Sequence, residues 1–188
     1  MNRYSSIWLV VAALSGAFSA KAGVIGQVKN VVPSTIRVSP GGEHVLAVTV
    51  DSRTQKRRVN LDGTLLPGSY DDIAKGTPFF SEDGQRHAFV GTRGTNCMVV
   101  VDGVEQPSYA MTTNRWPITG LVFGSDGSKT HLAYQVSEKD KHAVVVNGKK
   151  LGAYDSIKGG LPGIWDFYFE GSYFAYRAKV GDKMVACR

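Results

Sequence analysis

The residues best suited to catalysis or metal binding are few, and their spacing fits neither role. The four histidines have no H-x-x-x-H spacing of a zinc site. The sequence also has no G-x-S-x-G nucleophile motif, no phosphate loop and no dinucleotide-binding fingerprint. We therefore predict a noncatalytic protein without a bound metal or cofactor. The histidines are His44, His87, His131 and His142.

Aspartates that follow tyrosines leave a second interpretation open. Asp71 and Asp72 follow Tyr70, and Asp155 follows Tyr154. Carboxylates bind calcium, but aspartates also shape turns. We expect turns at these positions and keep metal binding as the alternative.

Cationic and aromatic residues between the expected strands are better candidates for binding a partner. Arginine and tryptophan are frequent anchors of binding surfaces. A rim that carries them fits a protein or an anionic envelope polymer. The alternative is that the cations are solvated loop residues and that the tryptophans cover the core. The candidate binding residues are Arg53, Arg57, Arg58, Arg93, Arg115, Trp116 and Trp165.

These residues lie in a sequence that repeats itself with a period of about forty residues, as stacked supersecondary units do. The copies begin at Val38, Phe80, Phe123 and Phe169. Each passes through a Ser, Gly or Asp turn into a second strand with a small residue, then through a polar loop into a third strand. The small residues are Ala47, Ala88, Ala133 and Ala175.

The third strands end in hairpin signals. β-Branched runs lead into Asp-Gly or Asn-Gly pairs, whose residues accept the positive φ of tight hairpin turns. No segment has the periodicity of an amphipathic helix. The pairs are Asp62-Gly63, Asp102-Gly103 and Asn147-Gly148.

Four antiparallel strands in each copy predict an all-β fold, a small four-bladed β-propeller. The fourth copy lacks a fourth strand, whereas the segment Val24–Val31 is left over before the first copy. We expect Val24–Val31 to pair with Met184–Cys187, because this pairing closes the ring and covers two sheet edges. The rival is an open, curved stack of blades that completes itself by dimerising.

The ring also predicts the state of the two cysteines. Cys97 begins the third strand of the second copy, and Cys187 ends that of the fourth. In a ring of four blades these copies lie opposite each other, whereas a disulfide needs Cα atoms within about 7 Å. We therefore expect no bridge between them.

Two phrases resemble the repeat of TolB-type, WD40-like β-propellers of bacteria. Ser81–Val90 (SEDGQRHAFV) is similar to the S-P-D-G phrase of that repeat, and Val99–Gly103 (VVVDG) fits its third strand. The resemblance covers nearly the whole chain after its first residues, and it implies a fold rather than an activity. Family members with more blades serve as protein-interaction modules, often in the periplasm, or cover peptidase domains. The repeat holds no catalytic residues to carry over.

The N-terminal residues have the pattern of a secretory signal. Arg3, the apolar run Ile7–Phe18 and the Ala20-Lys21-Ala22 site predict a signal peptide over 1–22 and a single domain over 23–188. The apolar run is too short to span a membrane, so we expect no membrane insertion after cleavage. A core strand or helix is the alternative for this segment. A periplasmic or secreted protein follows.

Charge and export together narrow the partner. The formal net charge of +6 favours anionic partners, and export argues against nucleic acid. The favoured hypothesis is an exported, noncatalytic propeller that binds a protein or envelope polymer through a basic, Trp-containing rim, as a monomer or small homo-oligomer. The alternative is a small-ligand or metal-binding protein, or an enzyme, that uses the central channel. A third possibility is a partial propeller that forms part of a larger ring.

Overall fold

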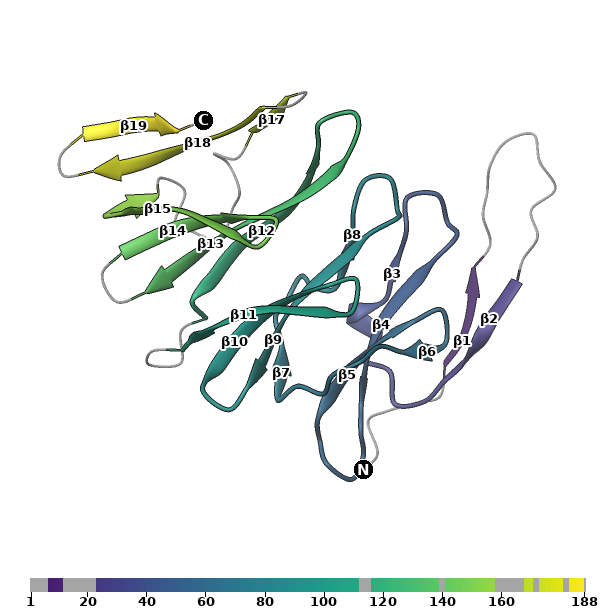
Figure 1. Ribbon diagram of the computed structural model, residues 1–188. Coiled ribbons are helices and arrows are strands. Elements are labelled where there is room, and N and C mark those ends of the chain that lie inside the picture. The colour runs from purple at the N-terminus through teal and green to yellow at the C-terminus, as the bar shows by residue number, and fades with distance from the viewer. Residues whose placement is uncertain are drawn as a thin grey trace. The chain divides into compact units, whose positions relative to one another are not determined.

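The computed structural model describes residues 7–11, 23–111, 116–138, 141–157, 168–170, 173–180 and 183–187. Within these residues the chain forms strands and one short 3-10 helix, η1 (Pro33–Thr35). The strands make four sheets in chain order and one two-stranded hairpin (Figure 1). The all-β prediction is confirmed. Among the described residues, no helix is long and apolar enough to cross a membrane.

The four sheets follow the four sequence copies. The hairpin consists of β1 (Ile7–Val11) and β2 (Gly23–Val28). The first sheet contains β3 (Arg37–Val38), β4 (Val45–Val50), β5 (Arg57–Leu61) and β6 (Thr64–Leu65). The second contains β7 (Asp72–Ile73), β8 (Phe79–Phe80), β9 (His87–Arg93), β10 (Asn96–Val101) and β11 (Val104–Ala110). The third contains β12 (Ile118–Ser125), β13 (Thr130–Glu138), β14 (Lys141–Val146) and β15 (Lys149–Tyr154). The fourth contains β16 (Ser156–Ile157), β17 (Tyr168–Glu170), β18 (Tyr173–Val180) and β19 (Lys183–Cys187).

Two compact units make up the chain: residues 1–94 with 99–105, and residues 95–98 with 106–188. The first unit holds the first sheet and strands β7 to β9. The second unit holds the third and fourth sheets. Strands β10 and β11 contribute residues to both.

One turn recurs in three sheets, where it joins β5 to β6, β10 to β11, and β14 to β15. Asp62, Asp102 and Asn147 have φ of 52°, 51° and 48°, as tight hairpin turns require. Each side chain accepts a hydrogen bond from the backbone N–H of one residue at the start of the second strand. Each turn residue also donates its own N–H to the carbonyl of that same residue. The clamped residues, which define equivalent positions, are Val45, His87 and Leu132.

The clamps show that the alanine marker is one residue out of register in the first copy. Ala47 lies two residues beyond Val45, whereas Ala88 directly follows His87. Because side chains alternate between the faces of a strand, Ala47 points to the opposite face. Ala47 therefore holds a position that aromatic residues hold in the other sheets, namely Phe89, Tyr134 and Tyr176.

The segment that leaves the first sheet crosses directly into the second. Tyr70 exchanges backbone hydrogen bonds of 2.7 and 2.9 Å with Arg57, and three residues later Ile73 pairs with Gly91 of β9. The sequence repeat had suggested one short fourth strand here, but the segment is shared between two sheets. Tyr154–Ile157 makes the same crossing from the third sheet to the fourth.

The N-terminal segment makes this crossing into the first sheet. Val31 pairs with Thr49 of β4. In the other two crossings the last residue pairs in the same way, Ile73 with β9 and Ile157 with β18. Val28 lies three residues before Val31, and so occupies the place of Tyr70 and Tyr154. The position of β2 before this crossing is therefore that of the last strand of a preceding sheet, although no four-stranded sheet precedes it in the chain.

The described partner of β2 differs from the one expected. β2 pairs with β1, from Val28 opposite Ile7 to Gly23 opposite Val11. Met184–Cys187 was the expected partner, but β19 pairs with β18. β1 belongs to the apolar run of the predicted signal peptide, which lies close to β2 along the chain and so loses little entropy on pairing.

An aromatic ring joins the first sheet to the second. Tyr70 is fully buried, and its ring meets Phe89 edge-on with centroids 5.3 Å apart. A Cβ atom added at Gly91 would lie 2.6 Å from Tyr70 Cδ1, so the absence of a side chain makes room for the ring. The Tyr70 hydroxyl donates to Glu105, which also binds Arg93 at 2.6 Å. Burial and the Glu105 carboxylate raise the pKa of Tyr70.

The third and fourth sheets meet in the same way. The rings of Tyr154 and Tyr176 are 5.7 Å apart, and their hydroxyl oxygens lie 2.6 Å from each other. Gly152 makes room for Tyr154, because a Cβ there would lie 2.2 Å from the ring. A crossing tyrosine that packs on the second strand of the next sheet is thus a repeated feature.

Candidate functional site

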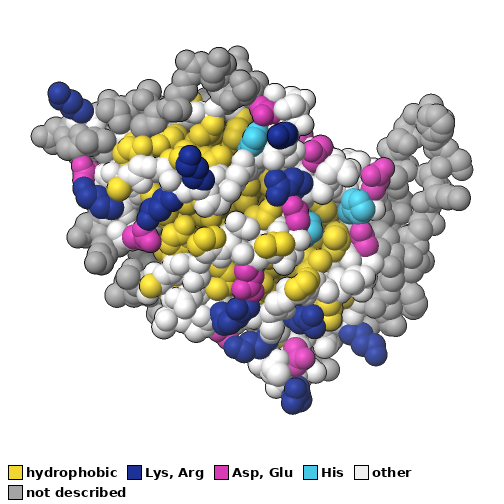
Figure 2. Space-filling model, viewed as in Figure 1, with side chains coloured by type: hydrophobic (Ala, Val, Ile, Leu, Met, Phe, Trp, Pro, Cys, Tyr) yellow, Lys and Arg dark blue, Asp and Glu magenta, His cyan; other side chains and the backbone are white. Residues whose placement is uncertain are grey.

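Two of the predicted rim arginines are paired with acids. Arg57 binds Asp72 at 2.7 Å, and Arg93 binds Glu105. Lys56 binds Asp71, a contact that Lys141 and Asp155 repeat in the third sheet. These exposed pairs each contribute about 0 to 1 kcal/mol to stability. Their larger effect is to neutralise the surface, which Figure 2 shows as neighbouring blue and magenta side chains.

The structure describes three of the other predicted residues. Arg53 is exposed in the β4–β5 turn, and Trp116 is half-buried before β12. Arg115 and Trp165 lie outside the described residues. Arg57 and Arg58 are successive residues of one strand, so their side chains leave opposite faces of the first sheet.

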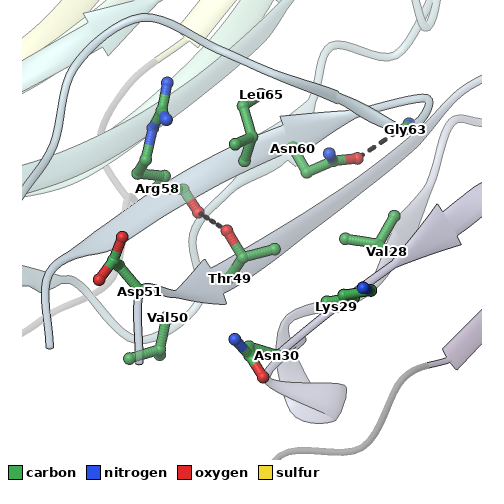
Figure 3. Close-up of a pocket in the computed structure, with 10 residues that line it drawn as sticks. All are labelled: Val28, Lys29, Asn30, Thr49, Val50, Asp51, Arg58, Asn60, Gly63 and Leu65. Carbon is green, nitrogen blue, oxygen red and sulfur yellow. Dashed lines mark hydrogen bonds between the residues drawn. The ribbon is translucent and has the colours of Figure 1, made fainter. Parts of the chain in front are cut away.

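Arg58 instead lines a cleft on the first sheet, which we call the first-sheet cleft. Its volume is about 280 Å³. The N-terminal segment forms one side, and strands β4 to β6 form the other (Figure 3). Its lining residues are Val28, Lys29, Asn30, Thr49, Val50, Asp51, Arg58, Asn60, Gly63 and Leu65.

The cleft is polar at positions that are apolar in the other sheets. Thr49, Arg58 and Asn60 share one face, because Thr49 pairs with Arg58 and Asn60 lies two residues farther along β5. The equivalent positions in the second sheet are Gly91, Met98 and Val100, and in the third sheet Val136, Ala143 and Val145. The apolar residues among these are buried. The first sheet therefore differs from the second and third in having three polar residues on this face.

The cleft is hollow because two aromatic rings are missing. Val28 stands where Tyr70 stands, and Ala47 stands where Phe89 stands. Val28, Val31 and Ala47 pack together as a small buried cluster, but they do not replace the volume of the rings. The first-sheet cleft is therefore the space that a tyrosine fills between the first and second sheets.

Two cations and one carboxylate set the charge of the cleft. Lys29 and Arg58 form no ion pair within the described residues. Arg58 Nη2 donates to the carbonyl of Leu66 at 3.3 Å, whereas its buried Nε has no hydrogen-bond partner in that part of the chain. The backbone N–H of Thr54 lowers the pKa of Asp51, which keeps this carboxylate ionised.

Hydrogen bonds orient the polar side chains. Asn60 Oδ1 accepts from the N–H of Gly63 at 2.9 Å, and the Thr49 hydroxyl donates to the Arg58 carbonyl at 3.3 Å (Figure 3). Asn60 is 2 % exposed and Thr49 is 7 % exposed. The face combines oriented polar groups with cations, which suits a small polar anion.

Two of the histidine rings contact the turn residues of the hairpin clamps. His44 Nδ1 lies 2.6 Å from the turn residue Asp62, and His131 Nδ1 lies 2.7 Å from Asn147. His142 Nδ1 contacts the Ser137 hydroxyl at 2.9 Å. Within the described residues no three His, Cys, Asp or Glu side chains form a group that fits a metal ion. Cys97 is a free, buried thiol, and burial raises its pKa to about 12.

Comparison with known proteins gives one structural likeness. No family model and no curated protein matches the sequence. Among solved structures, the chain is similar to the β-propeller domain of the Trilobed protease from Pyrococcus furiosus, which has an open velcro topology. The TM-score is 0.45 and the identity 10 %, over 86 % of this chain and 56 % of that chain. The chain thus spans about half the length of the propeller that it resembles.

Proposed function

We propose that this protein is an exported, noncatalytic four-bladed β-propeller that binds a negatively charged partner, a protein or an envelope polymer, in the first-sheet cleft. The observation that carries this proposal is the different use of the arginines. Arg57 and Arg93 are each bound to a carboxylate, whereas Arg58 lines a polar cleft beside Lys29. Cations that lack a carboxylate partner attract an anion with less competition.

Repeated pairing supports closure of the ring. In the first sheet the crossing tyrosine, Tyr70, pairs with Arg57 at the start of β5. In the third sheet Tyr154 pairs with His142, near the start of β14. Met184 holds this position in β19. Val28 holds the tyrosine position, so a closed ring places Val28 opposite Met184. Removal of the predicted signal peptide takes β1 away and frees β2 for this pairing.

Binding to charged and neutral polymers tests the proposed function. The exported protein is expected to bind polyglutamate or polygalacturonate, but not dextran, in a surface-based binding assay. The variant K29Q/R58Q should bind at least ten-fold more weakly, because it removes both cations of the cleft.

The control variant is R57Q/R93Q, which removes the same charge from the neutralised surface. It should keep most of the binding. Equal losses in both variants would mean that net charge alone attracts the polymer, and the cleft would then not be the site. Function in a central channel stays the alternative, and a stoichiometric metal in the purified protein would favour it.

A further inference from the structure

We infer that the first-sheet cleft is a vacated tyrosine socket that binds one acidic sugar ring of a polysaccharide, through its ring hydroxyls and its carboxylate. This inference rests on the proposed function and names its ligand. The crossing segment into the second sheet carries Tyr70, whereas the equivalent segment into the first sheet carries Val28.

The socket corresponds to the place that a six-membered ring occupies in the next sheet. Between the first and second sheets it holds the Tyr70 ring, which lies against Gly91 and Phe89. In the first sheet Val28 and Ala47 leave this space open. Its volume of about 280 Å³ lies just below the range of ligand pockets, which begins at about 300 Å³. One ring fits, with the rest of a chain outside.

The lining favours a hydroxylated ring over an aromatic one. Thr49 stands in place of Gly91, and Asn60 in place of Val100, so hydrogen-bonding groups replace an apolar floor. An aromatic occupant would cover these groups without satisfying them, which costs about 1–3 kcal/mol for each buried polar group. Sugar hydroxyls both donate and accept, and so satisfy the Asn60 amide and the Asp51 carboxylate.

The two cations of the cleft, Lys29 and Arg58, favour an acidic sugar over a neutral one. A carboxylate on the ring accepts from the Arg58 guanidinium, which lines the cleft and forms no ion pair within the described residues. Lys29 supplies a second positive charge on the opposite side of the cleft (Figure 3). Charge-assisted hydrogen bonds of this kind are about twice as strong as neutral ones. A neutral sugar of the same ring shape lacks them.

Calorimetry with matched oligosaccharides tests the ligand. The exported full-length protein is titrated with trigalacturonate and with galactotriose, which share the ring hydroxyls but not the carboxylates. We expect trigalacturonate to bind at least ten-fold more tightly. Equal affinities, or no binding of trigalacturonate, would overturn the inference.

Refilling the socket tests the place. The variant V28Y/T49G restores the pair that Tyr70 and Gly91 form, and should abolish trigalacturonate binding while thermal unfolding stays cooperative. If V28Y/T49G does not fold, the single variant N60V takes its place. It introduces the apolar residue that the second sheet has at this position, and it should weaken binding at least five-fold. Unchanged affinity in a folded variant of either kind would overturn the inference.

The outcomes separate this inference from the proposed function. If polyglutamate binds to the cleft, and K29Q/R58Q loses it while no uronate oligomer binds, then the function stands and the sugar is wrong. If neither anion binds, both fail.

Discussion

His87 is the most buried of the described histidines and lacks a partner for one ring nitrogen. Its Nε2 is buried without a hydrogen bond within the described residues, and Asp102 Oδ1 lies 3.6 Å from Nδ1. Burial lowers the pKa of His87 below its ordinary value of 6.5, with smaller contributions from Arg86 and His44, while Asp102 opposes the change. The folded protein therefore holds this histidine neutral.

Stability should consequently fall with pH below about 6.5. The unfolded chain protonates His87 first, so the stability is complete above pH 6.5 and is lost as the pH falls toward the folded pKa. For one proton the slope is at most about 1.4 kcal/mol per pH unit. Urea unfolding between pH 7 and pH 5 measures it. H87L, which carries the residue of the equivalent Leu132, should flatten the profile, and an unchanged slope would assign it to other groups.

Gly91 should tolerate no side chain while Tyr70 occupies the socket. G91A places a Cβ atom 2.6 Å from Tyr70 Cδ1, so we expect a loss of about 1–3 kcal/mol in the free energy of unfolding. Y70V/G91A places valine where the first sheet has Val28, and a small side chain where it has Thr49. The double variant should be more stable than the sum of the single changes predicts. Additive losses in urea unfolding would show that the two residues do not compete for space.

Arg58 shows how far single residues were predictable. The sequence alignment of third strands places Arg58 and Asn60 beside Met98 and Val100, so two polar residues interrupt an apolar pattern. That signal was available from the repeat alone. The ion pair of Arg57 was not, because its partner Asp72 comes from a crossing segment whose path the sequence does not specify.

Strand β2 extends the argument to whole elements. Its expected place as a fourth strand agrees with the crossing that Val28 to Val31 makes into the first sheet. The sequence predicted a spare strand from apolar residues and from the repeat count. It did not predict the pairing of β2 with β1, because the apolar run that contains β1 was assigned to a signal peptide and was given no partner.

The register of closure is testable by a disulfide. Arg57 and Tyr70 form a hydrogen-bonded pair, for which Cα atoms lie about 5.5 Å apart, within the disulfide range of about 4.4–6.8 Å. In a C187S background, V28C/M184C should therefore form an intramolecular disulfide in the protein without residues 1–22. Non-reducing electrophoresis and peptide mapping detect it.

A misplaced pair provides the control for this register. V28C/K149C, again in the C187S background, joins β2 to the start of β15 and should remain reduced. If both pairs cross-link, the termini are mobile and the closure register has no support. If V28C/M184C stays reduced while the protein is folded, β2 does not pair with β19.

At the scale of the molecule, the sequence repeat predicted the four sheets and their order, because three of the four copies carry the turn clamp and all four carry the apolar second strand. The aromatic junctions were less visible, since Tyr70 and Tyr154 act on the following sheet rather than on their own. The distribution of charge was predicted least well. Basic residues are easy to count in a sequence, whereas their acidic partners come from other strands.

The closed ring predicts an oligomeric state that depends on β2. If β2 closes the ring, it covers the edges of both terminal sheets, and light scattering after size exclusion should give the mass of a monomer. I25P/Q27P removes two backbone donors from β2, because proline lacks an N–H. The uncovered edges should then associate, and the mass should rise with concentration.

A proline outside β2 separates this effect from general destabilisation. E82P places proline in the exposed turn after Ser81, where Pro40 already follows Ser39 in the first copy. This variant should remain a monomer. If the unmodified protein is itself a dimer or larger, the chain is part of a composite ring, and the edges at β2 and β19 are the surfaces through which its copies meet.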